Sequence, residues 1–261
     1  HLLPVGESEF VAAAADDLAA RHPNAAPIAG IVAHADLAHS ELDAILDAHE
    51  AVSGGRFRGI RDSLAHALEP EAHLIPGRYG EGKFENPAFR RGVARLGQRN
   101  LSYDCWLFHH QNVEFAALAR AVPETTMVLD HFGTPLGVGP YESQREQIFE
   151  QWKIDIAEAA RCPNVVAKLG GLAMPDNGFG WHLADCPPTS DEVVAAHRDH
   201  YLHTIDCFGP ERCMFESNFP VDRVSVSYRV LYNAFKKMVG DFTDNERSAM
   251  FSGTASRVYA L

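Results

Sequence analysis

The chain repeats one pattern of hydrophobic and polar positions: a short apolar run that ends abruptly in polar side chains. The clearest examples are residues 126–133 and 213–222, in which the apolar run leads into His131 and Glu216 respectively. Runs of this kind are typical of buried strands in a parallel sheet, whose ligand sites lie at the carboxyl edge. We therefore expect the polar side chains of several strands to gather at one edge of a sheet.

Between these runs lie segments in which apolar residues recur at helical spacing. The expected strands lie within residues 27–36, 57–64, 100–108, 126–133, 164–171 and 213–216. The expected helices cover residues 7–21, 40–52, 88–99, 112–121 and 143–160, a segment from 190, and residues 225–239 and 243–259. Strict alternation predicts a parallel α/β sheet, either an eightfold barrel or an open doubly wound sheet. No G-x-G-x-x-G sequence opens a helix, so nothing favours a dinucleotide-binding fold.

The composition narrows the class of protein. The 261 residues are 46% hydrophobic and 22% charged, which is ordinary for a globular protein, and we expect one domain over residues 1–261. The 23 Lys and Arg against 35 Asp and Glu give a net charge of −12, and nucleic acid is not an expected partner. No apolar run reaches the roughly 20 residues that cross a bilayer, so no membrane is expected. Five cysteines without a C-x-x-C pair predict free thiols in the cytoplasm.

Four motifs in order resemble the amidohydrolase superfamily. They are FRGIR at 57–61, VLDHFGTP at 128–135, NVVAKLGG at 164–171 and MFESNFP at 214–220. The similarity is greatest to the TIM-barrel branch that includes pyrone-dicarboxylate lactonase and sugar-acid lactonases. It implies a TIM-type (β/α)₈ barrel with its site at the C-terminal mouth. The chain is expected to lack the first one or two strands of that barrel, including one with a His-x-His pair.

The resemblance also implies roles for individual residues. His131 corresponds to a histidine that is a metal ligand in some members and polarises a carbonyl in others. Arg61 corresponds to an arginine that meets a substrate carboxylate. Asn218 stands where the family usually has an aspartate that is a metal ligand or general base. Because Asn218 carries no charge and the His-x-His pair is not in the chain, a divalent metal is disfavoured. Zinc remains the alternative cofactor, and His131 would be its ligand.

Other polar residues near predicted strand ends carry two interpretations each. Lys168 is either a buried cation in a structural salt bridge, with a partner such as Asp130 or Glu216, or a site group with a lowered pKa. His109 is either a substrate contact or a solvated loop residue. Trp181 and His182 either form a lid over substrate or simply pack. Asp222 either replaces the carboxylate lost at position 218 or caps the helix that follows it.

The sequence thus predicts a hydrolase that opens a lactone or related cyclic ester of a small carboxylated molecule. In this hypothesis His131 polarises the carbonyl, Arg61 holds a carboxylate, and Asp222 or Glu216 activates water in place of Asn218. The alternatives are a metal-dependent decarboxylase on the same barrel and a barrel that binds a small acid without turning it over. The sequence is also compatible with a homo-oligomer.

Overall fold

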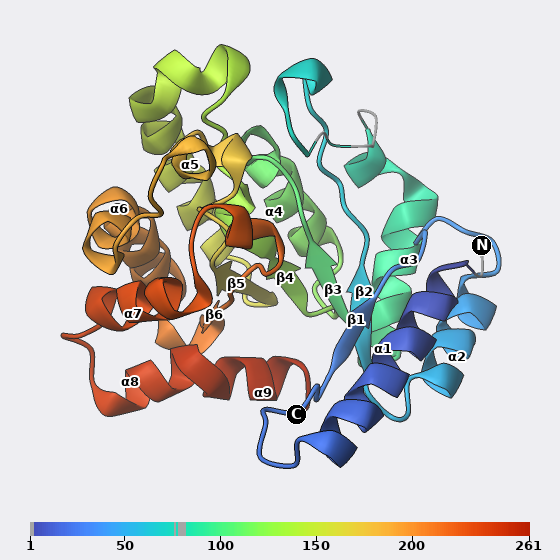
Figure 1. Cartoon of the computed structure of the whole chain (residues 1–261). Helices are drawn as coiled ribbons and strands as arrows, with labels where there is room; N and C mark the ends of the chain where they lie inside the picture. The colour runs from blue at the N-terminus through green and yellow to red at the C-terminus, as the bar shows by residue number, and fades with distance from the viewer. Residues whose placement is uncertain (1–2, 76, 78–81) are drawn as a thin grey trace.

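A curled parallel sheet organises the chain, and the computed structural model describes residues 3–75, 77 and 82–261 of it (Figure 1). The sheet contains six strands in sequence order within this part of the chain. The strands are β1 (Ile31–Ala33), β2 (Phe57–Arg61), β3 (Ser102–Cys105), β4 (Met127–Leu129), β5 (Val165–Leu169) and β6 (Cys213–Phe215). All five neighbouring pairs are parallel, and the β1–β2 register shifts between Ile31 and Val32.

The predicted alternation of strands and helices is confirmed over the described residues, although most strands are shorter than the apolar runs suggest. β1 and β6 each pair with one neighbour in the described chain, so the sheet is curled like part of a barrel without closing. The expected absence of two barrel strands stays a prediction.

Most of the helices cover the outside of the sheet, as Figure 1 shows, whereas the last one packs on its inner face. They are α1 (Leu3–Arg21), α2 (Leu42–Val52), α3 (Pro87–Gln98), α4 (Asn112–Ala121), α5 (Arg145–Ala160), α6 (Ser190–Phe208), α7 (Tyr228–Met238), α8 (Asp244–Ser248) and α9 (Thr254–Val258). A π-helical turn, Ala249–Gly253, joins α8 to α9. The closing helix predicted at residues 243–259 is thus confirmed as one continuous helical segment with a π-helical turn in its middle.

The main core lies between the sheet and these outer helices. Side chains of a strand alternate between its two faces, and Met127 and Leu129 of β4 point outward into this core. Trp152 of α5 is fully buried there and donates its Nε1–H to the carbonyl of Phe132 at 2.7 Å. Burying side chains of this size contributes about 1.5–3 kcal/mol each, so the outer core holds the strand exits in place.

The opposite, inner face of the sheet has a small apolar cluster of its own. Val128, Val166 and Met214 come from three adjacent strands and pack against α9 and the residue after it, Tyr259. The end of the chain then runs on to β1. A β carbon on Gly30 would lie 3.0 Å from Leu261 Cδ2, so the last residue is packed against the base of that strand. The C-terminal segment thus spans the open side of the sheet from β6 to β1.

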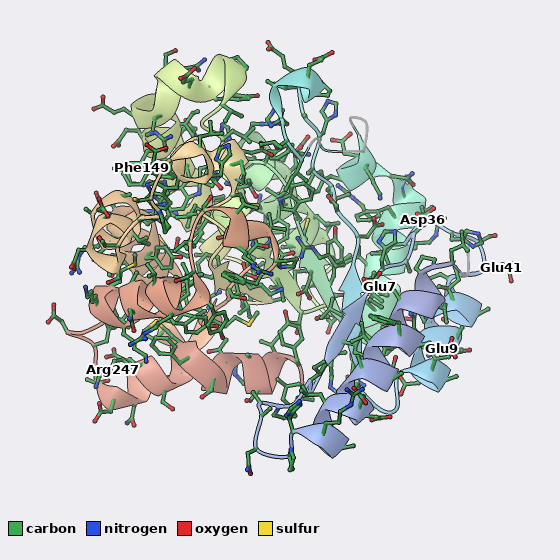
Figure 2. The ribbon with its side chains drawn as sticks, viewed as in Figure 1. Glu7, Glu9, Asp36, Glu41, Phe149 and Arg247 are labelled. Atoms are coloured by element: carbon green, nitrogen blue, oxygen red, sulfur yellow. The ribbon has the colours of Figure 1, made fainter. Side chains whose placement is uncertain are left out.

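The solvent face of α1 carries four acidic side chains, Glu7, Glu9, Asp16 and Asp17. Figure 2 shows Glu7 and Glu9 on this helix, on the opposite side of the view from Arg247 of α8, and both glutamates are exposed. None of the described helices combines the length and apolar character needed to cross a bilayer.

Candidate active site

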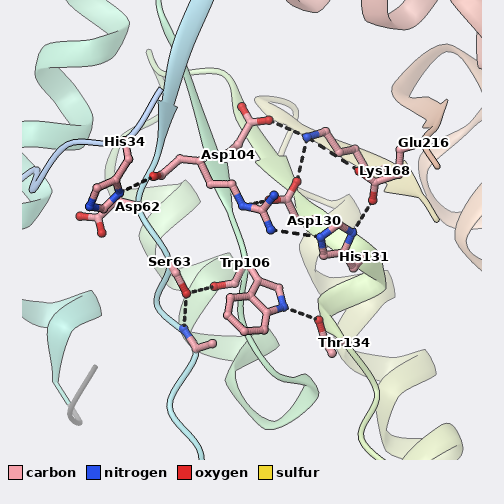
Figure 3. Close-up of polar contacts among 12 residues, drawn as sticks. His34, Asp62, Ser63, Asp104, Trp106, Asp130, His131, Thr134, Lys168 and Glu216 are labelled. Carbon is pink, nitrogen blue, oxygen red and sulfur yellow. Dashed lines mark hydrogen bonds and ion pairs between the residues drawn. The ribbon is translucent and has the colours of Figure 1, made fainter. Parts of the chain in front are cut away.

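Ionisable side chains line the inner face of the sheet at its carboxyl edge. They come from five successive strands or the residues directly after them, and we refer to them as the charged layer: Arg61, Asp104, Asp130, Lys168 and Glu216 (Figure 3). The carboxyl ends of parallel strands ring one mouth, which is why strands far apart in sequence deliver these groups to one place. Two cations face three carboxylates.

Lys168 is the centre of the charged layer. Its Nζ lies 2.8 Å from Asp104 Oδ2, 3.0 Å from Asp130 Oδ1 and 3.9 Å from Glu216 Oε2. Burial alone would lower the pKa of Lys168, but the carboxylates of Asp104 and Asp130 hold it well above its usual value. Lys168 is therefore a permanent cation. The idea that its pKa is lowered for chemistry is wrong, and the salt-bridge interpretation is confirmed.

Arg61 joins the charged layer to His131. Its Nε lies 3.1 Å from Asp130 Oδ2, and its Nη2 lies 3.1 Å from His131 Nε2. Burial works to raise the pKa of Asp130, but Arg61 and Lys168 outweigh it and keep that pKa below its ordinary value. The Arg61 side chain is 39% exposed, whereas that of Asp130 is fully buried. Arg61 thus presents part of its guanidinium to the mouth while Asp130 anchors it from below.

The partners of His131 define its tautomer. A guanidinium can only donate hydrogen bonds, so His131 Nε2 must accept from Arg61. His131 Nδ1 lies 2.5 Å from Glu216 Oε1, and an ionised carboxylate only accepts, so Nδ1 carries the proton. Burial opposes the charge on Glu216, but His131 and Lys168 lower its pKa overall. The pair is a neutral imidazole oriented by a carboxylate, with its basic nitrogen next to Arg61.

A left-handed turn directs His131 into the mouth. His131, Phe132 and Thr134 all have positive φ angles, of 54°, 59° and 36°. Non-glycine residues in this region cost about 1–3 kcal/mol each, so the surrounding packing must stabilise the turn. Gly171, directly after β5, leaves room for the imidazole because a β carbon there would lie 2.7 Å from His131 Nδ1.

The half-buried Asn218 and the buried Asp222 form a pair beyond β6. Asn218 donates its Nδ2–H to Asp222 Oδ1 at 2.7 Å, and the backbone N–H of Ala173 donates to Asp222 Oδ2 at 3.3 Å. Burial raises the pKa of Asp222 to about 7. The next helix, α7, is capped by the Ser227 side chain, so the interpretation of Asp222 as its cap is wrong.

The other predicted site residues contact different parts of the molecule. His109 is buried, accepts from the backbone N–H of Leu136 at 3.2 Å, and burial lowers its pKa to about 4. Trp181 packs against Phe179 with ring centroids 5.3 Å apart, next to α6. None of the described hydrogen bonds or ion pairs links His109, Trp181 or His182 to the charged layer. Their assignment to the substrate site stays a prediction.

The sequence interpretation missed two members of this network, Asp104 and Tyr259. Asp104 lies within β3, where it accepts from Ser102 Oγ at 2.8 Å and from the Tyr259 hydroxyl at 2.6 Å. The alternation of polar Ser102 and Asp104 with Tyr103 and Cys105 was a usable signal for the inner face. Nothing in the sequence around Tyr259 indicates its distant partner.

The described residues do not fit a divalent cation at His131. Both ring nitrogens of His131 are already engaged, one by Glu216 and the other by a guanidinium whose charge repels a cation. Asn218 directs its N–H donor at Asp222 rather than an oxygen at His131. Within residues 3–75, 77 and 82–261, no group of three or more His, Cys, Asp or Glu side chains is arranged to hold a metal ion.

A curled parallel α/β sheet with ionisable groups at its carboxyl edge is the arrangement found at the active sites of TIM-barrel enzymes. The chain belongs to the amidohydrolase family, which it matches over residues 5–261. It is a hydrolase of that family. The resemblance of the four motifs is thereby confirmed.

Individual relatives give a finer comparison. The chain is 33% identical over 259 residues to an uncharacterized protein, y4mH, of Sinorhizobium fredii, covering 99% of this chain and 76% of that protein. It is 30% identical over 210 residues to the L-fucono-1,5-lactonase of Burkholderia multivorans, covering 80% of this chain and 64% of the lactonase. A crystal structure of a Burkholderia multivorans amidohydrolase with bound zinc superposes with a TM-score of 0.77 at 26% identity, covering 98% of this chain and 79% of that one.

The raised pKa of Asp222 predicts a specific pH dependence of stability. A folded-state pKa of about 7, against 3.8 for an unperturbed Asp, means that the folded state binds a proton more tightly. This contribution is present in full below pH 4 and is lost as the pH rises through 7, a change of about 4 kcal/mol. We expect Asp222→Asn to remove this part of the pH dependence of the unfolding free energy. Urea unfolding at several pH values from 4 to 8 measures it.

The matched control is Asp241→Asn, which neutralises an exposed aspartate. The difference in unfolding free energy between wild type and Asp241→Asn should stay constant with pH. A constant difference for Asp222→Asn as well would contradict the raised pKa.

Proposed function

We propose that the protein opens a lactone or related cyclic ester of a small carboxylated molecule by hydrolysis. The observation that carries this proposal is the His131–Glu216 pair at 2.5 Å, with the basic nitrogen of His131 turned toward the half-exposed Arg61. A carboxylate that orients a neutral imidazole is a recurrent arrangement for moving a proton to and from a reacting oxygen. The similarity to a protein named L-fucono-1,5-lactonase supports a lactone as the substrate class.

In the first step, water attacks the lactone carbonyl carbon. His131 Nε2 takes a proton from that water as the new C–O bond forms, and the carbonyl oxygen becomes an oxyanion. The resulting imidazolium is stabilised by Glu216, whose pKa is already lowered by His131 and Lys168 against the effect of burial. The Arg61 guanidinium stabilises the oxyanion, which is the group that gains charge in the transition state.

In the second step, the tetrahedral intermediate collapses. The bond between the carbonyl carbon and the ring oxygen breaks, and the departing alkoxide takes the proton from His131 Nε2. The products are a carboxylic acid and a hydroxyl on one open-chain molecule, and the acid releases its proton to solvent to become a carboxylate. His131 returns to its neutral form with the proton on Nδ1, so the site is reset without any other reagent.

Arg61 has a second role in this proposal, because its contacts with Asp130 and His131 use only Nε and Nη2. A guanidinium has five N–H donors, so a substrate carboxylate can bind to the remaining ones. Binding an anion there draws the guanidinium away from His131 and leaves Nε2 able to accept a proton from water.

Asp222 is a second candidate for the base, because a pKa of about 7 is suited to proton transfer near neutral pH. Its side chain is fully buried and both oxygens already accept hydrogen bonds. Glu216, the other carboxylate considered from the sequence, orients His131 in this proposal and does not act on water directly.

The role of Arg61 is tested by comparing two lactones that differ only in a carboxylate. For wild type we expect kcat/KM to be about 10- to 100-fold higher with the carboxylated lactone, since a charge-assisted pair is worth about 1.5–3 kcal/mol. Arg61→Gln should remove this preference. The control is Arg58→Gln, which changes an arginine whose described hydrogen bonds are to the carbonyls of Gly55 and Phe57. A preference that survives in Arg61→Gln would contradict carboxylate binding by Arg61.

A further inference from the structure

The Asp104 carboxylate accepts three hydrogen bonds, although Asp104 lies within a strand and is fully buried. Its Oδ1 accepts from Ser102 Oγ at 2.8 Å. Its Oδ2 accepts from Lys168 Nζ at 2.8 Å and from the Tyr259 hydroxyl at 2.6 Å. Lys168 and Tyr259 therefore share one oxygen atom, and the position of the ammonium depends on how much charge the hydroxyl withdraws from that atom.

Tyr259 is brought to this oxygen by the C-terminal segment. Together with Ala255 and Val258 of α9 it packs on the inner face of the sheet, under the charged layer. The Lys168 ammonium lies 5.8 Å from the centre of the Tyr259 ring. Burial and the neighbouring Asp104 raise the pKa of Tyr259 well above its usual value, so its hydroxyl keeps its proton and acts as a donor.

We propose that Tyr259 is a positioning residue of the hydrolytic site, which it serves by fixing the Lys168 ammonium between Asp104 and Asp130. This inference rests on the function proposed above. The hydroxyl takes up part of the charge on Asp104 Oδ2, so Asp104 does not draw the ammonium entirely to itself. Lys168 then stays within 3.0 Å of Asp130, which in turn anchors Arg61 through Nε.

Loss of the Tyr259 hydroxyl should move the Lys168 ammonium in one direction, toward Asp104. Without it, Asp104 Oδ2 carries more charge and draws Lys168 away from Asp130 and Glu216. Arg61 and the His131–Glu216 pair then lose the electrostatic support that fixes their geometry. Tyr259 does not touch the substrate in this proposal, so its removal should affect kcat rather than KM.

The experiment compares Tyr259→Phe with Tyr103→Phe. Tyr103, which is fully buried where Tyr259 is half-buried, is the control because its hydroxyl donates at 2.8 Å to the backbone carbonyl of Asp62 and not to the charged layer. The first readout is the ammonium signal of Lys168 in protein labelled with ¹⁵N at lysine Nζ. The chain has five lysines, and Lys168→Met assigns the signal. The second readout is kcat and KM for lactone opening.

We expect Tyr259→Phe to shift the Lys168 ammonium signal and to lower kcat about tenfold with KM changed less than about threefold, as for loss of a hydrogen bond to a charged group. Tyr103→Phe should leave the Lys168 signal in place. The double variant Tyr259→Phe/Asp104→Asn should show no further loss of kcat beyond Asp104→Asn, because the hydroxyl acts through Asp104.

An unshifted Lys168 signal in Tyr259→Phe, or a shifted signal with unchanged kcat, would overturn the inference. If the signal shifts but wild type opens no lactone, the hydrolase proposal fails while the link between Tyr259 and Lys168 stands. If Tyr259→Phe does not fold, Asp104→Asn alone must shift the Lys168 signal, and failure to do so counts against the inference.

Discussion

Replacing Glu216 by glutamine is expected to lower kcat for lactone opening by about 10²–10⁴-fold while KM stays within about threefold. Glutamine has nearly the same shape but no charge to stabilise the imidazolium that forms at His131. Its amide N–H can also donate to Nδ1, which would move the imidazole proton to Nε2 and remove the basic site from the mouth. Steady-state kinetics at saturating and limiting substrate measure both parameters.

The matched control is Glu211→Gln, a glutamate exposed just before β6. It removes one negative charge from the same region of the chain without touching the charged layer, so kcat should change by less than about twofold. Equal loss of activity in both variants would mean that net charge, and not the orientation of His131, governs the rate. A fully active Glu216→Gln enzyme would shift the role of base to Asp222.

Replacing Lys168 by methionine is expected to give the largest loss of stability, about 3–5 kcal/mol at pH 7. Methionine fills similar space but leaves the carboxylates of Asp104, Asp130 and Glu216 with Arg61 as the nearest described cation. Removing one partner of a buried ionic network costs far more than the network contributes, because the remaining charges stay desolvated. Chemical unfolding of wild type and variant at pH 7 measures the difference.

The pH dependence of the unfolding free energy tests this explanation of the Lys168→Met effect. The pKa values of Asp130 and Glu216 are lowered in the folded protein, and Lys168 is among the causes of both shifts. Their contribution to stability is therefore present above the unfolded pKa of about 4 and is lost as the pH falls. The difference between wild type and Lys168→Met should shrink on acidification.

Lys237→Met is the control for Lys168→Met, because Lys237 pairs with Asp191 on the surface at 2.7 Å. Such exposed pairs contribute about 0–1 kcal/mol. A Lys168→Met variant that loses no more stability than Lys237→Met would contradict the account of the charged layer.

The strand exits could be predicted from the sequence because they are local features. An apolar run that ends near His131, Lys168 or Glu216 indicates both a strand and the polar groups at the end of that strand. Parallel pairing then brings these ends together irrespective of the distance between them along the chain. The same reasoning located Arg61 at the end of β2.

Asp130 and Glu216 could be predicted as partners of Lys168, because they follow neighbouring strands, but the other partners could not. Lys168 also pairs with Asp104, which lies inside β3 and not at the end of an apolar run, and Asp104 pairs with Tyr259, 155 residues further along the chain. The packing of α9 on the inner face depends on how the whole sheet curls. The sequence left the role of Asp222 ambiguous for a related reason. Its carboxylate accepts a hydrogen bond from the backbone N–H of Ala173, which lies in the loop after a different strand, β5.

The central claim is that the His131–Glu216 pair hydrolyses a lactone at the mouth of the sheet. The most direct measurement follows carboxylated and uncarboxylated lactones, L-fucono-1,5-lactone among them, in ¹⁸O-labelled water with mass spectrometry of the product. The account predicts a ring-opened acid with one ¹⁸O atom in its new carboxylate, formed at similar rates by wild type and Glu211→Gln and about 10²–10⁴-fold more slowly by Glu216→Gln. Release of carbon dioxide from the carboxylated compounds, or ring opening no faster than in buffer alone, would contradict it.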